Sequence, residues 1–213
     1  MRGITAEYVN DYIAKLQPER NELMRRMESY ADEHDVPIIG PVGGQFLYSV
    51  AKIHRSERIL EAGTAIGYTS LWFARATEAW NGHVTTLDKN EAMAEIARDN
   101  LNEAGVRDRV DIVVGDAIKS LRTLEGPFDL CFLDHEKEQY QEFLEIALPK
   151  IAPGGVILAD NVLRRGDVAS ADGGGDAMVQ AMREFNRFMT DHPELESMIV
   201  PLRDGIALAI KSD

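Results

Sequence analysis

The amino-acid sequence predicts an α/β fold with a mostly parallel sheet. From residue 58 onward, short apolar runs typical of strands alternate five times with helical patterns, which is the order of βαβ units with helices on both faces of a sheet. Of the 213 residues, 45% are hydrophobic and 28% are charged, a globular composition that excludes disordered, collagen-like and disulfide-rich chains. Since no repeat or long linker interrupts the chain, we expect a single domain over residues 1–213, with an N-terminal helical segment (1–57) and an α/β core (58–213).

Each element follows from a local pattern. Residues 5–16 and 19–34 place apolar side chains at helical spacing, and a third helix is expected at 42–53, after the helix breakers Gly40 and Pro41. In the core we predict strands at 58–61, 83–87, 109–114, 128–133 and 155–159, and helices at 69–78, 91–104, 117–123, 138–150 and 177–190. A glycine-rich loop, 166–175, precedes the last helix, and the patterns at 196–201 and 205–211 indicate a hairpin, which gives a seven-stranded sheet whose last strand is antiparallel.

Charge and cysteine content narrow the function. The formal net charge of −13 disfavours broad electrostatic capture of nucleic acid or of an anionic membrane. Residues 1–58 hold eight basic and nine acidic side chains, so a polyanion would meet the least repulsion there. The single cysteine, Cys131, lies in an apolar run, which excludes a disulfide scaffold and a cysteine zinc site and predicts a buried, inert thiol. No apolar stretch of about 18 residues is present, so we expect a soluble, cytoplasmic protein with no membrane partner.

Polar residues follow the first three strands of the predicted core, at the edge where open α/β sheets bind ligands. Residues 61–69 form a glycine-bearing turn into a helix, which differs from the dinucleotide motif and carries no phosphate-binding lysine; the glycines serve either a ligand or packing. Asp88 ends the second strand and is suited to accept hydrogen bonds from a ribose diol, or to cap the next helix. Asp116 has two roles open to it in the same way, accepting from an adenine amine or capping a helix. An adenosine-like ligand is therefore expected.

The fourth and fifth strands are followed by a second set of polar residues. Asp134, Asp160 and Asn161 offer carboxylate and amide oxygens, which suit Mg²⁺ or Ca²⁺ better than zinc, although the two aspartates are also suited to capping helices. Lys137 follows Asp134 by three positions and is either a solvated lysine or a base. His135 is a metal ligand, a packed ring or a ring that faces substrate.

Three segments together resemble one family. Residues 59–69 (Ile-Leu-Glu-Ala-Gly-Thr-Ala-Ile-Gly-Tyr-Thr), 133–137 (Leu-Asp-His-Glu-Lys) and 160–163 (Asp-Asn-Val-Leu) are similar to the metal-dependent O-methyltransferases that use S-adenosylmethionine (SAM), which include the catechol and caffeoyl-CoA enzymes. The resemblance spans about residues 37–211 and implies a Rossmann-like methyltransferase fold.

The resemblance also implies a role for individual residues. Ile39 would contact the cofactor. The methionine part of the cofactor would be held by Glu61, Gly63 and Thr69. Asp88 would bind the ribose, and Asp116 and Ala117 would face the adenine. Asp134, Asp160 and Asn161 would bind Mg²⁺, with Ca²⁺ or Mn²⁺ as alternatives, and Asp134 would also lie near the cofactor. Lys137 matches the base of the family.

Segments outside the three motifs predict the substrate. Residues 8–13, 31–38 and 192–205 are most similar to bacterial tRNA 5-hydroxyuridine methyltransferases, which implies methylation of the wobble base in the tRNA anticodon loop to 5-methoxyuridine. Arg164 and Arg165 would then meet phosphates, although the net charge argues against RNA. The alternative is a small catechol or hydroxycinnamoyl-CoA substrate. The tRNA base and the small substrate both offer two adjacent oxygens to the metal, so the metal site alone does not choose between them.

A third interpretation is a protein that binds a nucleotide but catalyses no reaction. A nucleotide-binding module without catalysis would bind its ligand independently of Mg²⁺ and would have no evident need for Asp134, Lys137 and Asp160 together. The apolar positions of the first helix, which include Tyr8 and Tyr12, predict either a homodimer interface or a cover over the cofactor. The family resemblance also implies a homodimer.

Overall fold

The computed structural model describes residues 4, 6–170 and 176–213, and its elements follow the predicted order. Three helices precede the first strand, as the sequence predicts: α1 (Glu7–Lys15), α2 (Glu22–Glu33) and α3 (Gly40–His54). The core contains the strands β1 (Arg58–Ala62), β2 (His83–Asp88), β3 (Val110–Val114), β4 (Phe128–Leu133), β5 (Ile151–Asp160), β6 (Leu195–Val200) and β7 (Ile206–Lys211). Its helices are α4 (Tyr68–Ala76), α5 (Glu91–Glu103), α6 (Ala117–Thr123), α7 (Tyr140–Ala147) and α8 (Ala177–Asp191).

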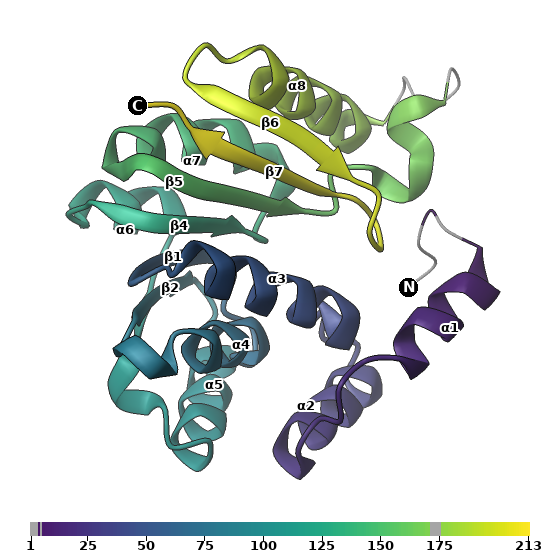
Figure 1. Cartoon of the computed structure of the whole chain (residues 1–213), viewed down its shortest axis with the longest axis vertical. Coiled ribbons are helices and arrows are strands. Elements are labelled where there is room, and N and C mark those ends of the chain that lie inside the picture. The colour runs from purple at the N-terminus through teal and green to yellow at the C-terminus, as the bar shows by residue number, and fades with distance from the viewer. Residues whose placement is uncertain (1–3, 5, 171–175) are drawn as a thin grey trace.

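The seven strands form one sheet in the order β3-β2-β1-β4-β5-β7-β6 (Figure 1). β1 to β5 pair in parallel, and β7 runs antiparallel between β5 and β6, which confirms the predicted fold class and the antiparallel last strand. The strand order reverses at β1 and β4, so a crevice is expected at their carboxyl ends.

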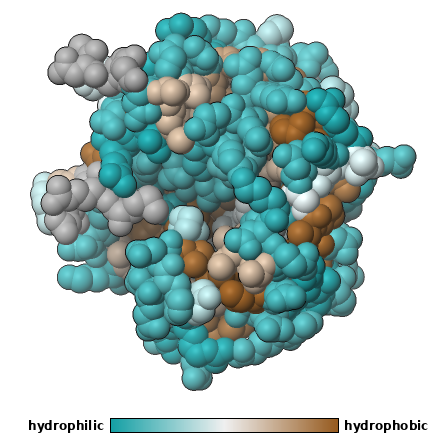
Figure 2. Space-filling view, turned by 180° about the vertical axis from the view of Figure 1, so that it is seen from behind, coloured by the Kyte–Doolittle hydropathy of each residue, from teal (hydrophilic) through white to brown (hydrophobic). Residues whose placement is uncertain are grey.

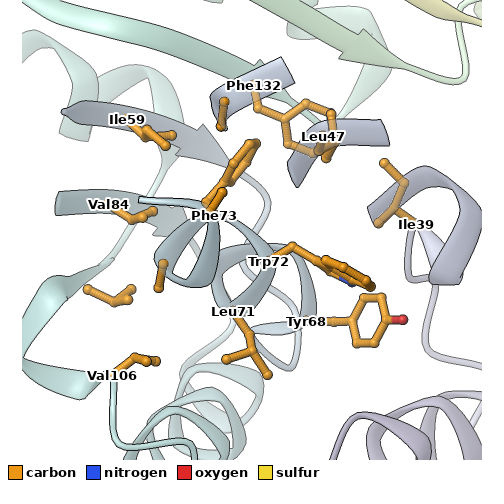
Figure 3. Packing of buried hydrophobic residues seen from close by; sticks show 14 of the residues in the cluster. Ile39, Leu47, Ile59, Tyr68, Leu71, Trp72, Phe73, Val84, Val106 and Phe132 are labelled. Atoms are coloured by element: carbon orange, nitrogen blue, oxygen red, sulfur yellow. The ribbon is translucent and has the colours of Figure 1, made fainter. Parts of the chain in front are cut away.

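Two hydrophobic clusters cover the two faces of the sheet. One lies under α2 to α5 and includes the side chains of Leu47, Tyr68, Trp72 and Phe73; in Figure 3 the rings of Tyr68 and Trp72 lie side by side, and Phe73 lies near Ile59 of β1. The other lies under α6 to α8 and contains Cys131, whose thiol is fully buried as predicted. Because both faces are buried, the central strands are apolar on both sides, as parallel strands in α/β proteins are.

Some predicted boundaries were wrong for local reasons. Gly40 and Pro41 begin α3 instead of preceding it, because proline is tolerated in the first turn of a helix. β5 begins at Ile151, four residues early, because Pro153 and Gly154 are accommodated where the register of β4 and β5 shifts. The helix predicted at 138–150 is shorter, since 3₁₀ turns at Lys137–Gln139 and Leu148–Lys150 flank α7.

The segment that follows β5 is less regular than the sheet and its helices. Arg164–Ala169 form a 3₁₀ segment (η5), and residues 171–175 of the predicted 166–175 loop lie outside the described residues. Helix α1 lies at the periphery, and Tyr8, Tyr12 and Leu16 on it are exposed (Figure 1). The face in Figure 2 is mostly hydrophilic, with small separate hydrophobic patches. Within the described residues, the helices are too short or too polar to span a membrane.

Candidate active site

A cavity of about 580 Å³ opens at the carboxyl ends of β1, β2 and β4, where the strand order predicts a crevice. Most of the residues predicted for the site line it: Gly63, Thr69, Asp88, Asp116, Ala117, Asp134, Lys137 and Asn161. Three others, Ile39, Glu61 and Asp160, do not line it and are almost fully buried. The family resemblance placed a cofactor contact in the segment before α3 at Ile39, but the residues of this segment that line the cavity are Asp35, Val36, Pro37 and Ile38.

The glycine turn after β1 is shaped by close backbone packing. Gly63 has φ of +105°, and a Cβ there would lie 2.2 Å from the carbonyl oxygen of Asp134, so a larger residue would separate the ends of β1 and β4. Gly67 begins α4 in the left-handed region without a side-chain cap. The first residues of α4, Tyr68 and Thr69, line the cavity, so the positive end of the helix dipole favours an anionic group there.

Asp88 and Asp116 are held by backbone N–H groups. The two oxygens of Asp88 accept hydrogen bonds from Ala65 N at 2.8 Å and Asn90 N at 2.9 Å. Asn90, not Asp88, caps α5, so the capping interpretation of Asp88 was wrong. Asp116 does cap α6 by accepting from Lys119 N at 2.9 Å, and it also lines the cavity. Both carboxylates keep further lone pairs for a ligand.

Glu61 lies behind the cavity rather than in it. One carboxyl oxygen accepts a hydrogen bond from the Ser70 hydroxyl, while Oε1 has no partner among the described residues. Complete burial raises the pKa of Glu61 to about 8, and the hydrogen bonds from Ser70 and Thr86 only partly oppose that shift. A proton or a cationic neighbour would therefore stabilise this carboxyl group.

Two carboxylates at the ends of β4 and β5 are paired with cationic side chains. Asp134 Oδ1 accepts from Lys137 Nζ at 2.6 Å, and Asp160 Oδ2 accepts from Arg203 Nη1 at 2.9 Å. Asp160 is 2% exposed, and its Oδ1 has no partner within the described part of the chain. Burial and the nearby charge of Asp134 raise the pKa of Asp160 to about 6, although Arg203 and Lys137 oppose the shift.

His135 is a packed ring that also lines the cavity. Its centroid lies 5.2 Å from that of Tyr140 and 4.8 Å from that of Phe143, and neither ring nitrogen has a hydrogen-bond partner among the described residues. Burial, followed by the charge of Lys137, lowers the pKa of His135 to about 4. The ring is therefore neutral near pH 7.

Sequence reasoning missed two residues of this site. Arg203 lies in the connection between β6 and β7, 43 residues from Asp160, and only the folded chain brings them together. Tyr140 begins α7 and accepts from Lys137 Nζ at 2.7 Å, while burial raises the pKa of its hydroxyl well above the ordinary value. The spacing of three residues from Lys137 to Tyr140 was visible, but it alone does not distinguish a contact from two independent side chains.

The sheet order, the glycine turn and the acidic groups around the cavity define a Rossmann-like enzyme that binds a nucleoside cofactor. A family model for O-methyltransferases matches residues 15–212. The chain belongs to this O-methyltransferase family, and it is a SAM-dependent O-methyltransferase of the catechol and caffeoyl-CoA type.

Individual relatives agree with this assignment. The chain is 39% identical over 173 residues to the catechol O-methyltransferase of Mycobacterium tuberculosis, covering 78% of this chain and 77% of that protein. It is 34% identical over 215 residues to the catechol O-methyltransferase of Niastella koreensis, covering 96% of each chain. The crystal structure of the O-methyltransferase TomG of Streptomyces achromogenes, in complex with SAM, matches with a TM-score of 0.87 and 31% identity over 97% of this chain and 96% of that one.

Proposed function

We propose that this protein transfers the methyl group of SAM to one hydroxyl of a small aromatic substrate with two adjacent oxygens, such as a catechol, with the help of a divalent cation. The observation that carries the proposal is the group of Asp134, Lys137, Asp160 and Asn161 at the ends of β4 and β5, beside a cavity large enough for a nucleoside cofactor. The two catechol O-methyltransferases among the relatives support the substrate class.

The cofactor would lie across the ends of β1, β2 and β3. Asp88, oriented by two backbone N–H groups, would accept from the ribose hydroxyls. Asp116 and Ala117 would face the adenine, while Gly63 and Thr69 at the start of α4 would hold the methionine part. Glu61 and Ile39 lie behind this layer, so we assign them to its support and, for Glu61, to charge compensation of the cationic methionine part.

The metal ligands would be Asp134, Asp160 and Asn161. Their fit rests on the buried, unpartnered Oδ1 of Asp160 and on the hard oxygen donors that Mg²⁺, Ca²⁺ and Mn²⁺ prefer. Among the described residues, no three His, Cys, Asp or Glu side chains form a cluster suited to a metal, so these two carboxylates and one amide would need oxygens from substrate or water to complete the shell. Such a cation would act as a Lewis acid that helps to orient the substrate and lowers the pKa of its hydroxyl.

Lys137 would accept the proton of the reacting hydroxyl at Nζ. Lys137 lines the cavity together with Asp134, and hydrogen bonds to Asp134 and Tyr140 fix the position of Nζ. Proton removal leaves a lone pair on the substrate oxygen, which forms the new O–CH₃ bond as the S–CH₃ bond breaks and its electrons return to sulfur. Arg203 would hold Asp160 Oδ2 and leave Oδ1 free for a cation.

The tRNA substrate implied by the flanking segments is less well supported. Arg20 and Arg26, two of the N-terminal arginines, are paired with Glu28 and Glu103, and so offer less charge to a phosphate backbone. Of the two arginines predicted to meet phosphates, Arg165 is exposed, whereas the Nε of Arg164 is buried and has no hydrogen-bond partner among the described residues. We therefore place 5-hydroxyuridine of tRNA second and include it in the test.

The substrate test uses purified protein with SAM and Mg²⁺. Catechol, caffeic acid, a caffeoyl thioester and tRNA that contains 5-hydroxyuridine are incubated separately, and mass spectrometry detects the methylated product. We expect turnover of a catechol or caffeoyl substrate, far above that of tRNA, and its loss in Asp160→Ala. Formation of 5-methoxyuridine at a higher rate than any small product would reverse the order of the two substrates.

We also propose a homodimer that covers α1. Tyr8 is 77% exposed, and Tyr12 and Leu16 are each 64% exposed, so one face of α1 presents a row of large apolar side chains. A second copy would bury this face. Light scattering should give twice the chain mass for the wild type and a single chain mass for Tyr12→Glu, and a monomeric wild type would refute the dimer.

A further inference from the structure

Tyr140 is a fully buried tyrosine whose hydroxyl has several partners at the catalytic end of the sheet. Its ring packs edge-on against Phe185, with centroids 5.1 Å apart, and against His135 on another side. Because packing fixes the ring, the hydroxyl has one position and does not search for partners.

The hydroxyl of Tyr140 lies between two strand ends. It is 2.9 Å from the carbonyl oxygen of Leu133 at the end of β4 and 3.2 Å from that of Asp160 at the end of β5. Leu133 and Ala159 are the last residues that pair β4 with β5. The Tyr140 hydroxyl therefore lies where the pairing of these two strands ends. The single O–H proton is thus shared between two carbonyl oxygens, one at the end of each strand.

The same oxygen also accepts a hydrogen bond. Lys137 Nζ donates to it at 2.7 Å and to Asp134 Oδ1 at 2.6 Å, and Nζ lies 4.9 Å from the centroid of the Tyr140 ring. The lysine is therefore held from two sides, by a carboxylate and by a phenol whose own position is set by the strand ends. Its side chain is only 14% exposed, so water offers little competition for these contacts.

A second lysine–tyrosine pair provides a comparison. Lys52 Nζ donates to the Tyr48 hydroxyl at 3.0 Å and lies 5.2 Å from its ring centroid, on the surface of α3 and away from the cavity. The two pairs have similar local geometry, but only the Lys137–Tyr140 pair is anchored to the ends of two strands.

We propose that Tyr140 is a positioning residue for methyl transfer: its hydroxyl, itself held by the strand ends at Leu133 and Asp160, keeps Lys137 Nζ directed toward the acceptor hydroxyl. This inference rests on the proposed role of Lys137 as the group that accepts the proton. Tyr140 itself touches neither substrate nor cofactor, since it does not line the cavity.

The first test compares two substrates in Tyr140→Phe, which keeps the ring and removes the hydroxyl. For catechol, we expect kcat to fall about tenfold, as loss of a hydrogen bond to a charged group does, with KM little changed. The melting temperature should fall by a few degrees, because two buried carbonyl oxygens lose their donor. For 4-nitrocatechol, whose hydroxyl is already ionised at neutral pH, the fall should be much smaller, because no proton has to be removed. An equal loss for both substrates would indicate a merely structural role and overturn the proposal. Tyr48→Phe, the matched control, should retain wild-type rates.

A double-mutant cycle tests whether Tyr140 acts through Lys137. In a Lys137→Met background, Tyr140→Phe should cause no further loss of kcat with catechol, because the positioned group is already absent. Losses that multiply as independent effects would overturn the proposal.

A measurement without substrate separates this inference from the proposed function. In protein labelled with ¹⁵N-lysine, the Nζ–H signal of Lys137, identified by its loss in Lys137→Met, should be protected from exchange in the wild type. It should broaden in Tyr140→Phe and persist in Tyr48→Phe. A protected signal in Tyr140→Phe would overturn the positioning role, whereas the expected spectra from a protein that methylates no catechol would refute the proposed function alone.

Discussion

The proposed cofactor side of the cavity, at the ends of β1 to β3, and the proposed catalytic side, at the ends of β4 and β5, hold their carboxylates differently. On the cofactor side, Asp88 and Asp116 accept from backbone N–H groups, which lie no more than 23 residues away in the sequence. On the catalytic side, Asp134 and Asp160 accept from the side chains of Lys137 and Arg203. Backbone donors carry no net charge and do not titrate, whereas the cationic side chains neutralise the carboxylates, and a lysine can also transfer protons. The comparison therefore assigns rigid recognition to one side and chemistry to the other.

The largest effect is expected from Lys137→Met on the catalytic side. Loss of a general base lowers rates by about 10² to 10⁴-fold, so kcat with catechol should fall within that range. The Kd of SAM, measured by titration calorimetry, should change little, because the recognition groups on the cofactor side remain. A large loss of SAM affinity with a modest loss of kcat would remove the division between the two sides.

Arg203→Met should produce the next largest effect, this time on stability. It leaves the buried carboxylate of Asp160 without its cation, and breaking a buried pair in this way costs about 3 kcal/mol. Urea denaturation in the presence of a chelator measures this free energy. Arg26→Met is the matched control, because the Arg26–Glu103 pair is exposed and its loss should change stability far less. Equal decreases in the free energy of unfolding for Arg203→Met and Arg26→Met would show that the buried Asp160–Arg203 pair contributes no more to stability than an exposed pair.

On the cofactor side, Asp88→Asn should weaken SAM binding rather than catalysis. The amide keeps one acceptor oxygen but loses the charge, and hydrogen bonds to charged groups contribute about 1.5–3 kcal/mol, so Kd should rise about tenfold or more. At saturating SAM, kcat should be nearly that of the wild type. A variant with a normal Kd for SAM and a reduced kcat would show that Asp88 acts in catalysis and not in cofactor binding.

Glu61 should make stability depend on pH. Since its pKa is about 8 in the folded protein and 4.5 is its usual value, the folded chain holds a proton between these values that the unfolded chain has lost. The free energy of unfolding should therefore decrease as pH rises from about 4.5 to about 8, by at most about 1.4 kcal/mol per pH unit from this group. Glu61→Gln should flatten this part of the profile of urea midpoints against pH. An unchanged slope would mean that Glu61 ionises normally.

The same comparison explains what the sequence could predict. Alternating strands and helices place Asp88, Asp116, Asp134 and Asp160 at strand ends by topology alone, so these positions followed from the pattern. Helix α6 and strand β4 were predicted with their observed bounds, because apolar periodicity and flanking polar residues mark both ends. The turn at Pro153 and Gly154 misled the prediction of β5, since only its pairing with β4 shows that the strand continues.

Long-range partners were beyond local patterns. Arg203 reaches Asp160 across 43 residues, and it comes from a hairpin connection whose sequence suggests only a turn. Tyr140 was visible as an apolar position of a helix, but its contacts with Leu133 and Asp160 depend on where two strands separate. Local sequence therefore predicts which groups are present, and tertiary packing decides which of them neutralise one another.

The dependence of catechol methylation on Mg²⁺ shows whether the ends of β4 and β5 carry out metal-assisted chemistry. Initial rates are measured for the wild type and for Asp160→Asn, first with a chelator and then over increasing Mg²⁺, at saturating SAM. The account predicts a rate near background with the chelator, a saturable increase with Mg²⁺ in the wild type, and a much weaker increase in Asp160→Asn. Full wild-type activity in the chelator, or an Asp160→Asn response equal to that of the wild type, would contradict the assignment of metal-assisted chemistry to the ends of β4 and β5.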